Sequence, residues 1–146
     1  MEVAEIKRRI DCCIGLFYAN DSDLLSRENY EVTTSSKLAQ YLVFHFPEYQ
    51  VDCEYNKHID ERKENEGKNI RPDIVIHKRG TDEKNLVYIE IKTDHNRDDK
   101  THDMDKIKSV TKQDREYRYK LGVFIDFYRE KNDLVLKFFE DGEEII

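Results

Sequence analysis

Two acidic residues stand inside apolar, β-branched segments of the chain. Asp73 follows Pro72 at the start of the run that ends at His77, and Glu90 lies in the run from Leu86 to Lys92. An unpaired carboxylate is costly to bury, so strands rarely carry one without a partner or a metal. Two acids and a lysine on adjacent strands are suited to hold one or two hard divalent cations and an activated water.

Strand alternation places these groups together. Residues two apart on a strand share a face, so Glu90 and Lys92 point the same way. The polar turn between the two runs is centred near residues 81–82, and an antiparallel hairpin around it sets Asp73 opposite Glu90. We therefore predict that Asp73, Glu90 and the carbonyl of Ile91 bind Mg²⁺ or Mn²⁺, and that Lys92 positions the attacking water.

The surrounding elements follow from hydrophobic periodicity and turn residues. Apolar residues three and four apart predict a helix over 3–18 and a second one from N-cap candidates at 33–36 to Phe46. The charged stretch 58–69 is interpreted as a loop or an extended hairpin connection. The remaining elements are predicted as strands over 49–56, 71–77, 86–92, 120–128 and 134–139, with a helix over 101–117.

The motif and this order of elements together resemble a known family. Pro72-Asp73, then Glu90-Ile91-Lys92 after a hairpin, is similar to the PD-(D/E)xK signature of the restriction-endonuclease-like superfamily. The segments 51–56 and 71–77 also resemble those of small stand-alone bacterial or phage members of unassigned role. The resemblance implies an α/β fold with an αβββαβ core, a central mixed sheet flanked by helices, and an extra N-terminal helix. It makes 1–146 a single nuclease-like domain, with a helical extension over 1–30, the core over 31–128 and a C-terminal strand over 129–146.

The resemblance also implies further site residues. Many members of the superfamily add an acid from the first core helix, and Glu31 is the best match, with Glu28 and Glu54 as rivals. An acid such as Glu31 is equally suited to stabilise a helix N-terminus. The helix after Glu90 often turns a basic or amide residue toward the substrate, for which Lys106, Lys112 and Gln113 are candidates.

The function implied is that of a Mg²⁺-dependent endo- or exodeoxyribonuclease, a hydrolase of DNA phosphodiester bonds. One alternative is a set of structural ion pairs in which Lys92 neutralises Asp73 and Glu90. Another is an inactive nuclease fold that serves as a binding or assembly module. The helix over 3–18 would then offer a surface for a homodimer. DNA and RNA substrates are not distinguished by the sequence.

Composition narrows the class of protein. The chain has 146 residues and a net charge of −7, which argues against coating nucleic acid through bulk positive charge but does not exclude a nuclease. No apolar run is long enough for a membrane span, and the N-terminus lacks the apolar stretch of a signal peptide. Three cysteines without a CxxC spacing predict reduced, buried thiols. We therefore expect a cytoplasmic protein that does not associate with membranes.

Overall fold

The computed structural model describes residues 1–26, 31–55, 57–58, 61–62, 64–65, 68–69, 71–93 and 100–146. Its α-helices are α1 (Val3–Asp21), α2 (Glu31–His45) and α3 (Lys100–Thr111), with short 3₁₀ helices at Ser22–Ser26 and Lys131–Asp133. The strands of the main sheet are β1 (Gln50–Cys53), β6 (Ile74–His77), β7 (Val87–Thr93), β8 (Leu121–Phe127), β9 (Val135–Glu140) and β10 (Glu143–Ile145).

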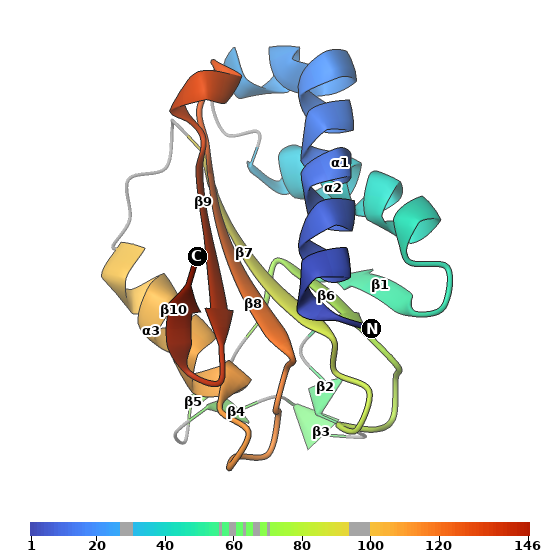
Figure 1. The fold of residues 1–146 in the computed structure, drawn as a ribbon, viewed down its shortest axis with the longest axis vertical. Coiled ribbons are helices and arrows are strands. Elements are labelled where there is room, and N and C mark those ends of the chain that lie inside the picture. The colour runs from blue at the N-terminus through green and yellow to red at the C-terminus, as the bar shows by residue number, and fades with distance from the viewer. Residues whose placement is uncertain are drawn as a thin grey trace.

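The main sheet is mixed. Its six strands lie in the order β1-β6-β7-β8-β9-β10, with β7 and β8 parallel and the other neighbours antiparallel. Helix α3 connects the two parallel strands, as such a crossover requires. Figure 1 shows α1 and α2 on one face of this sheet and α3 on the other. The predicted α/β fold with a central mixed sheet flanked by helices is therefore confirmed.

Each sheet face has its own apolar core, which follows from the alternation of side chains along the strands. Ile74, Ile89 and Ile91 belong to the larger core, together with the apolar stripes of α1 and α2. Val75 and Tyr88 point to the opposite face and pack with the α3 residues in the smaller core. Because Glu90 and Lys92 alternate with Ile89 and Ile91, their side chains lie on the α3 face.

Helix α1 is built into the larger core. The stripe predicted from the sequence is buried within the chain itself, through Ile6, Ile10, Cys13, Ile14 and Phe17. The suggestion that this helix offers an apolar surface for a homodimer is therefore wrong for that stripe. No helix in the described part of the chain is long and apolar enough to cross a membrane.

Several element ends differ from the predicted ones. Helix α2 begins at Glu31, so residues 33–36 lie inside it rather than at its N-cap. Helix α3 ends at Thr111 instead of 117, and the side-chain amide of Gln113 donates to the Thr111 carbonyl, one of those that a helix end leaves without a partner in the helix. The charged segment contains two short antiparallel pairs, and the final strand β10 was not predicted. Those pairs are β2 (Lys57–His58) with β3 (Glu61–Arg62), and β4 (Glu64–Asn65) with β5 (Lys68–Asn69).

The cysteines are free thiols, but only Cys13 is buried. Cys12 and Cys53 are exposed, so the prediction of buried thiols is wrong for these two. Cys12 lies on the outer face of α1, beside the buried stripe to which Cys13 belongs, and Cys53 ends β1.

Candidate functional site

Asp73 is anchored where β6 begins. Its Oδ2 accepts a hydrogen bond of 2.6 Å from the backbone N–H of Ile91 on β7. Its own carbonyl accepts one of 3.1 Å from the N–H of Glu54. The register pairs Ile74 with Ile89, so Asp73 continues the ladder at the level of Glu90. The predicted hairpin register is confirmed, and it brings the two acids together.

The carbonyl of Ile91 is the third predicted metal ligand. In an antiparallel ladder the N–H and C=O of one residue point toward the same neighbouring strand. The Ile91 N–H is directed at the Asp73 carboxylate, so the Ile91 carbonyl points to the same side of β7. This backbone oxygen and the Asp73 side chain therefore face one region at the end of β6.

Glu90 is buried on the α3 face of the sheet, with 5% of the residue exposed. One of its oxygens, Oε1, accepts a hydrogen bond of 3.0 Å from the Tyr88 hydroxyl. The same oxygen lies 2.9 Å from the Lys106 ammonium on α3. Of the three residues considered as substrate contacts, Lys106 forms this ion pair with Glu90, and its role toward a substrate stays a prediction. The side-chain amide of Gln113 donates to the carbonyls of Thr111, the last residue of α3, and of Tyr119.

Burial and mutual repulsion disfavour a doubly ionised pair. Loss of solvation, followed by the charge of Glu90, raises the pKa of Asp73 to about 7, although the Ile91 N–H opposes the shift. Burial also raises the pKa of Glu90, and the Lys106 ammonium opposes that shift. A cation between two carboxyl groups in such surroundings would remove the repulsion, which is the electrostatic condition for a metal site.

Lys92 forms an ion pair with an acid of α3. Its ammonium lies 3.1 Å from Oδ2 of Asp103 on α3, and both side chains are about nine-tenths buried. The alternative in which Lys92 neutralises Asp73 and Glu90 did not name this partner, Asp103. Two ion pairs, Lys92–Asp103 and Lys106–Glu90, join β7 to α3. A further pair, Lys100–Asp126, joins β8 to α3.

The structure describes two of the three candidates for a third acidic residue of the site, Glu31 and Glu54. Glu31 lies in the first turn of α2, and Glu28 lies outside the described residues. Glu54 lines a cavity of about 60 Å³ that also contains Asp73 and the α2 residues Val32, Ser35 and Ser36. That volume has room for about four water molecules. Asp73 therefore borders a small cavity next to Glu54 and the start of α2.

The oxygen atoms of Asp73, Glu90 and the Ile91 carbonyl suit Mg²⁺ better than a metal ion whose ligands must all come from the protein. Within the described ranges, no three His, Cys, Asp or Glu residues are grouped so that they could hold a metal ion. Mg²⁺, however, is usually bound by one or two carboxylates and keeps several of its waters. Asp73 and Glu90 are two such carboxylates, and the cavity of about 60 Å³ beside Asp73 has room for metal-bound waters.

Two contributors to the site were missed at the sequence level. Asp103 holds Lys92, and Tyr88 holds Glu90. The i, i+3 spacing of Asp103 and Lys106 on one helix face, and the i, i+2 spacing of Tyr88 and Glu90 on one strand face, were available signals. Strand alternation places His77 on the same face as Asp73. In the structure, His77 Nε2 lies 2.7 Å from Oδ2 of Asp52 on β1.

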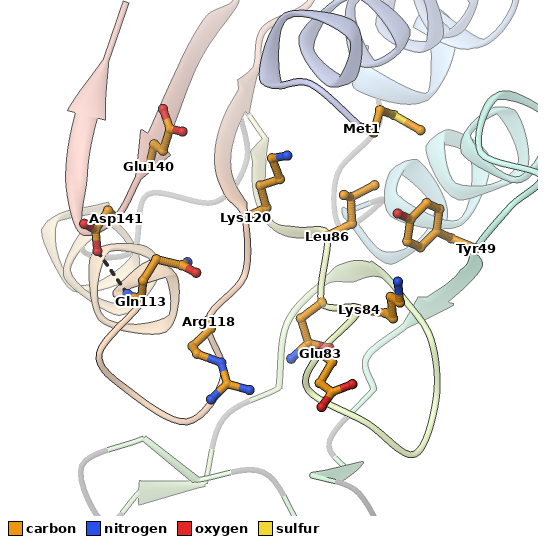
Figure 2. A pocket seen from close by; sticks show the side chains of 11 residues that line it. Met1, Tyr49, Glu83, Lys84, Leu86, Gln113, Arg118, Lys120, Glu140 and Asp141 are labelled. Atoms are coloured by element: carbon orange, nitrogen blue, oxygen red, sulfur yellow. Dashed lines mark hydrogen bonds between the residues drawn. The ribbon is translucent and has the colours of Figure 1, made fainter.

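A larger cavity of about 580 Å³ lies at the opposite end of the parallel strands. Figure 2 shows Lys84, Arg118 and Lys120 on its wall together with Glu83 and Glu140. Glu90 is four residues beyond Leu86, which lines this cavity, or about 13 Å along β7. The candidate metal site and the larger cavity are therefore separate.

Comparisons of the chain with protein-family models, with curated proteins and with solved structures find no match.

Proposed function

We propose that this protein is a Mg²⁺-dependent nuclease of the PD-(D/E)xK type that hydrolyses phosphodiester bonds of DNA. The observation that carries the proposal is the pairing of two buried carboxyl groups, Asp73 and Glu90, whose pKa values are both raised. The Asp73 side chain is fixed by the Ile91 N–H and borders a cavity large enough for water. Such a pair is stabilised by a hard divalent cation.

Each residue has a defined task in this proposal. Asp73, Glu90 and the Ile91 carbonyl would hold the metal. The bound metal would polarise the scissile phosphate and activate a water. Lys92, whose ammonium Asp103 keeps in place, would orient that water toward phosphorus. Glu31 or Glu54 would complete the acidic set from the cavity side.

The order of elements supports the same proposal. Apart from the short pairs β2–β5, the chain runs α2-β1-β6-β7-α3-β8, which is the αβββαβ order that the resemblance implies. The acids occur at the start of β6 and within β7, as the motif requires. The parallel pairing of β7 with β8 places the carboxyl ends of both strands beside the site.

Contacts with DNA would have to be local, because the net charge of the chain is −7. Arg71 is exposed two residues before Asp73, and its guanidinium would be the candidate to bind a phosphate of the substrate. In contrast, Arg79 is engaged with Asp52. The side chains of Arg62, Lys63 and Lys68 lie outside the described residues.

A cleavage assay tests the proposed function. Supercoiled and linear DNA, single-stranded DNA and RNA would each be incubated with Mg²⁺ or EDTA. We expect DNA cleavage by the wild type that requires Mg²⁺ and is lost in Asp73→Asn and Lys92→Met. The exposed α3 acid Asp105 supplies the matched control Asp105→Asn, which should cleave like the wild type. Equal cleavage by all four proteins would refute the assignment.

A second candidate function has its own support. Glu90 and Lys92 are both at least nine-tenths buried and ion-paired with α3, as expected for a nuclease fold that has become a binding or assembly module. In that case Mn²⁺ would produce no binding heat and no change in thermal stability. Binding of Mn²⁺ that depends on Asp73 would rule out this candidate.

Location and self-association belong to the same proposal. Free, exposed thiols at Cys12 and Cys53 are consistent with the reducing cytoplasm. If a homodimer forms, it would use the outer face of α2, where Phe44 is 83% exposed and Val43 is 50% exposed. Sedimentation of the wild type beside Phe44→Ser tests this surface, and a monomeric wild type would refute it.

A further inference from the structure

We propose that Lys106 is a built-in counter-ion of the carboxylate pair, and that a divalent cation binds by displacing its ammonium from Glu90. This inference rests on the proposed function, because it assumes that Asp73 and Glu90 bind a metal. The inference adds Lys106, a residue outside the motif, as a competitor of the metal ion for Glu90. Metal loading then requires a side-chain movement on α3.

The first support is the contact itself. Lys106 Nζ lies 2.9 Å from Glu90 Oε1, and the two side chains are 18% and 6% exposed. The Tyr88 hydroxyl binds the same oxygen at 3.0 Å. A carboxylate oxygen that already accepts two strong donors has little capacity for a third ligand. A metal that used Oε1 would therefore have to replace one of them.

The second support is the position of the charge. The Lys106 ammonium lies 2.9 Å from Glu90 Oε1, and its charge also acts on Asp73, the residue opposite Glu90 in the hairpin. It thus acts on the same two groups that a bound metal would contact. An ammonium and a divalent cation at one place would repel each other strongly in these buried surroundings. The two cations are therefore alternatives.

The third support is a difference between the two lysines of the site. Lys92 lies on a central strand and is held by Asp103, with 10% of its side chain exposed. Lys106 lies on a helix at the surface of the molecule and is more exposed. Its flexible stem lets the ammonium move into water while the stem stays packed. Lys106 is therefore the cation that can leave.

Metal affinity measured by calorimetry tests the inference directly. Mn²⁺ would be titrated into the wild type, Lys106→Met and, as the control, Lys108→Met, which removes an exposed lysine of the same helix. Without the competitor, Lys106→Met should bind Mn²⁺ at least about tenfold more tightly. Lys108→Met should bind like the wild type. Equal or weaker binding by Lys106→Met would overturn the inference and leave the metal site intact.

Absence of binding in both the wild type and Lys106→Met would overturn the metal site as well, so the two failures are distinguishable. A second readout does not depend on folding of the variant. The wild type would be acylated briefly at its amines with and without saturating Mn²⁺, and the modified peptides quantified by mass spectrometry. Reactivity of Lys106 should rise several-fold with Mn²⁺, while Lys108 stays unchanged. Unchanged reactivity of Lys106 in the metal-bound protein would refute the displacement.

Discussion

Asp73 and Glu90 come from different strands, and each depends on a third element for its partners. The backbone of β7 supplies the N–H that holds Asp73, and α3 supplies the ammonium that holds Glu90. Neither arrangement removes the cost of placing two acids side by side in a protein interior. A site of this kind lowers the stability of the protein in the absence of its cation, which is common where function requires a concentrated charge.

The first prediction concerns the protonation of Asp73. Its folded-state pKa of about 7 lies above that of the unfolded chain, so its contribution to stability is present at low pH and lost as the pH rises through 7. Asp73→Asn keeps an oxygen for the Ile91 N–H but carries no charge. At pH 8 we expect its free energy of unfolding to exceed that of the wild type by at least about 1 kcal/mol.

Urea unfolding at pH 8 and pH 5 measures this difference. At pH 5 the wild-type carboxyl group is protonated in the folded state, and most of the gain should disappear. The exposed Asp105→Asn should show no such pH dependence. A destabilised Asp73→Asn at pH 8 would show that the ionised carboxylate is favourable where it lies, contrary to our electrostatic account.

The second prediction concerns the Lys92–Asp103 pair. Lys92→Met leaves Asp103 buried without its cation, which should cost about 3–5 kcal/mol of stability. Adding Asp103→Asn should restore part of that loss, because the remaining group is neutral. A thermodynamic cycle over the wild type, both single variants and the double variant gives the coupling free energy. Additive effects would mean that the two groups do not interact in solution.

At the level of elements, the sequence predicts most of the β6–β7 hairpin but little of how α3 packs on it. Alternation and the turn centre predicted the register that sets Asp73 beside Glu90, because both depend on local geometry. The partner of Lys92 was not predictable in the same way. Which α3 side chains reach β7 depends on how closely and at what rotation the helix packs on the sheet, and no local pattern specifies either quantity.

Gly122 on β8 sets the closeness of that packing. A Cβ atom at this position would lie 2.2 Å from Cγ2 of Ile107 and 2.9 Å from Cγ2 of Thr111, both on α3. Gly122→Ala should therefore displace α3 and destabilise the protein by about 1–3 kcal/mol. It should also weaken Mn²⁺ binding, because α3 carries Asp103 and Lys106.

Gly15 provides the matched control for this third prediction. It lies within α1, where an added Cβ atom would meet only the Lys131 ammonium at 3.8 Å. Gly15→Ala should stabilise the protein by about 0.5–1 kcal/mol through helix propensity. Chemical denaturation of both variants gives the comparison. A neutral Gly122→Ala would show that α3 does not pack as closely as described.

For the whole molecule, the main consequence of the fold is that α1 cannot be separated from the domain. Its buried stripe forms the larger core with α2 and the sheet, on the face opposite α3 (Figure 1). The sequence predicted the stripe but not its partner, since an amphipathic helix is equally suited to a dimer interface and to an intramolecular core.

The fourth prediction separates these two uses of α1. Ile10→Ala removes a fully buried side chain from the core and should cost about 2–5 kcal/mol of stability. The oligomeric state of the folded protein should not change. Thermal unfolding and size-exclusion chromatography measure the two quantities. If Ile10→Ala formed a smaller oligomer than the wild type but unfolded at the same temperature, the buried stripe of α1 would have to face another molecule.

The central claim is that Asp73 and Glu90 form a metal site, and a crystal structure grown with Mn²⁺ tests it most directly. The account predicts an anomalous scattering peak about 2 Å from a carboxylate oxygen of each residue, with the Ile91 carbonyl as a further ligand. Lys106 should have turned away from Glu90. A structure without this peak, in which Lys106 remains bound to Glu90, would contradict the account.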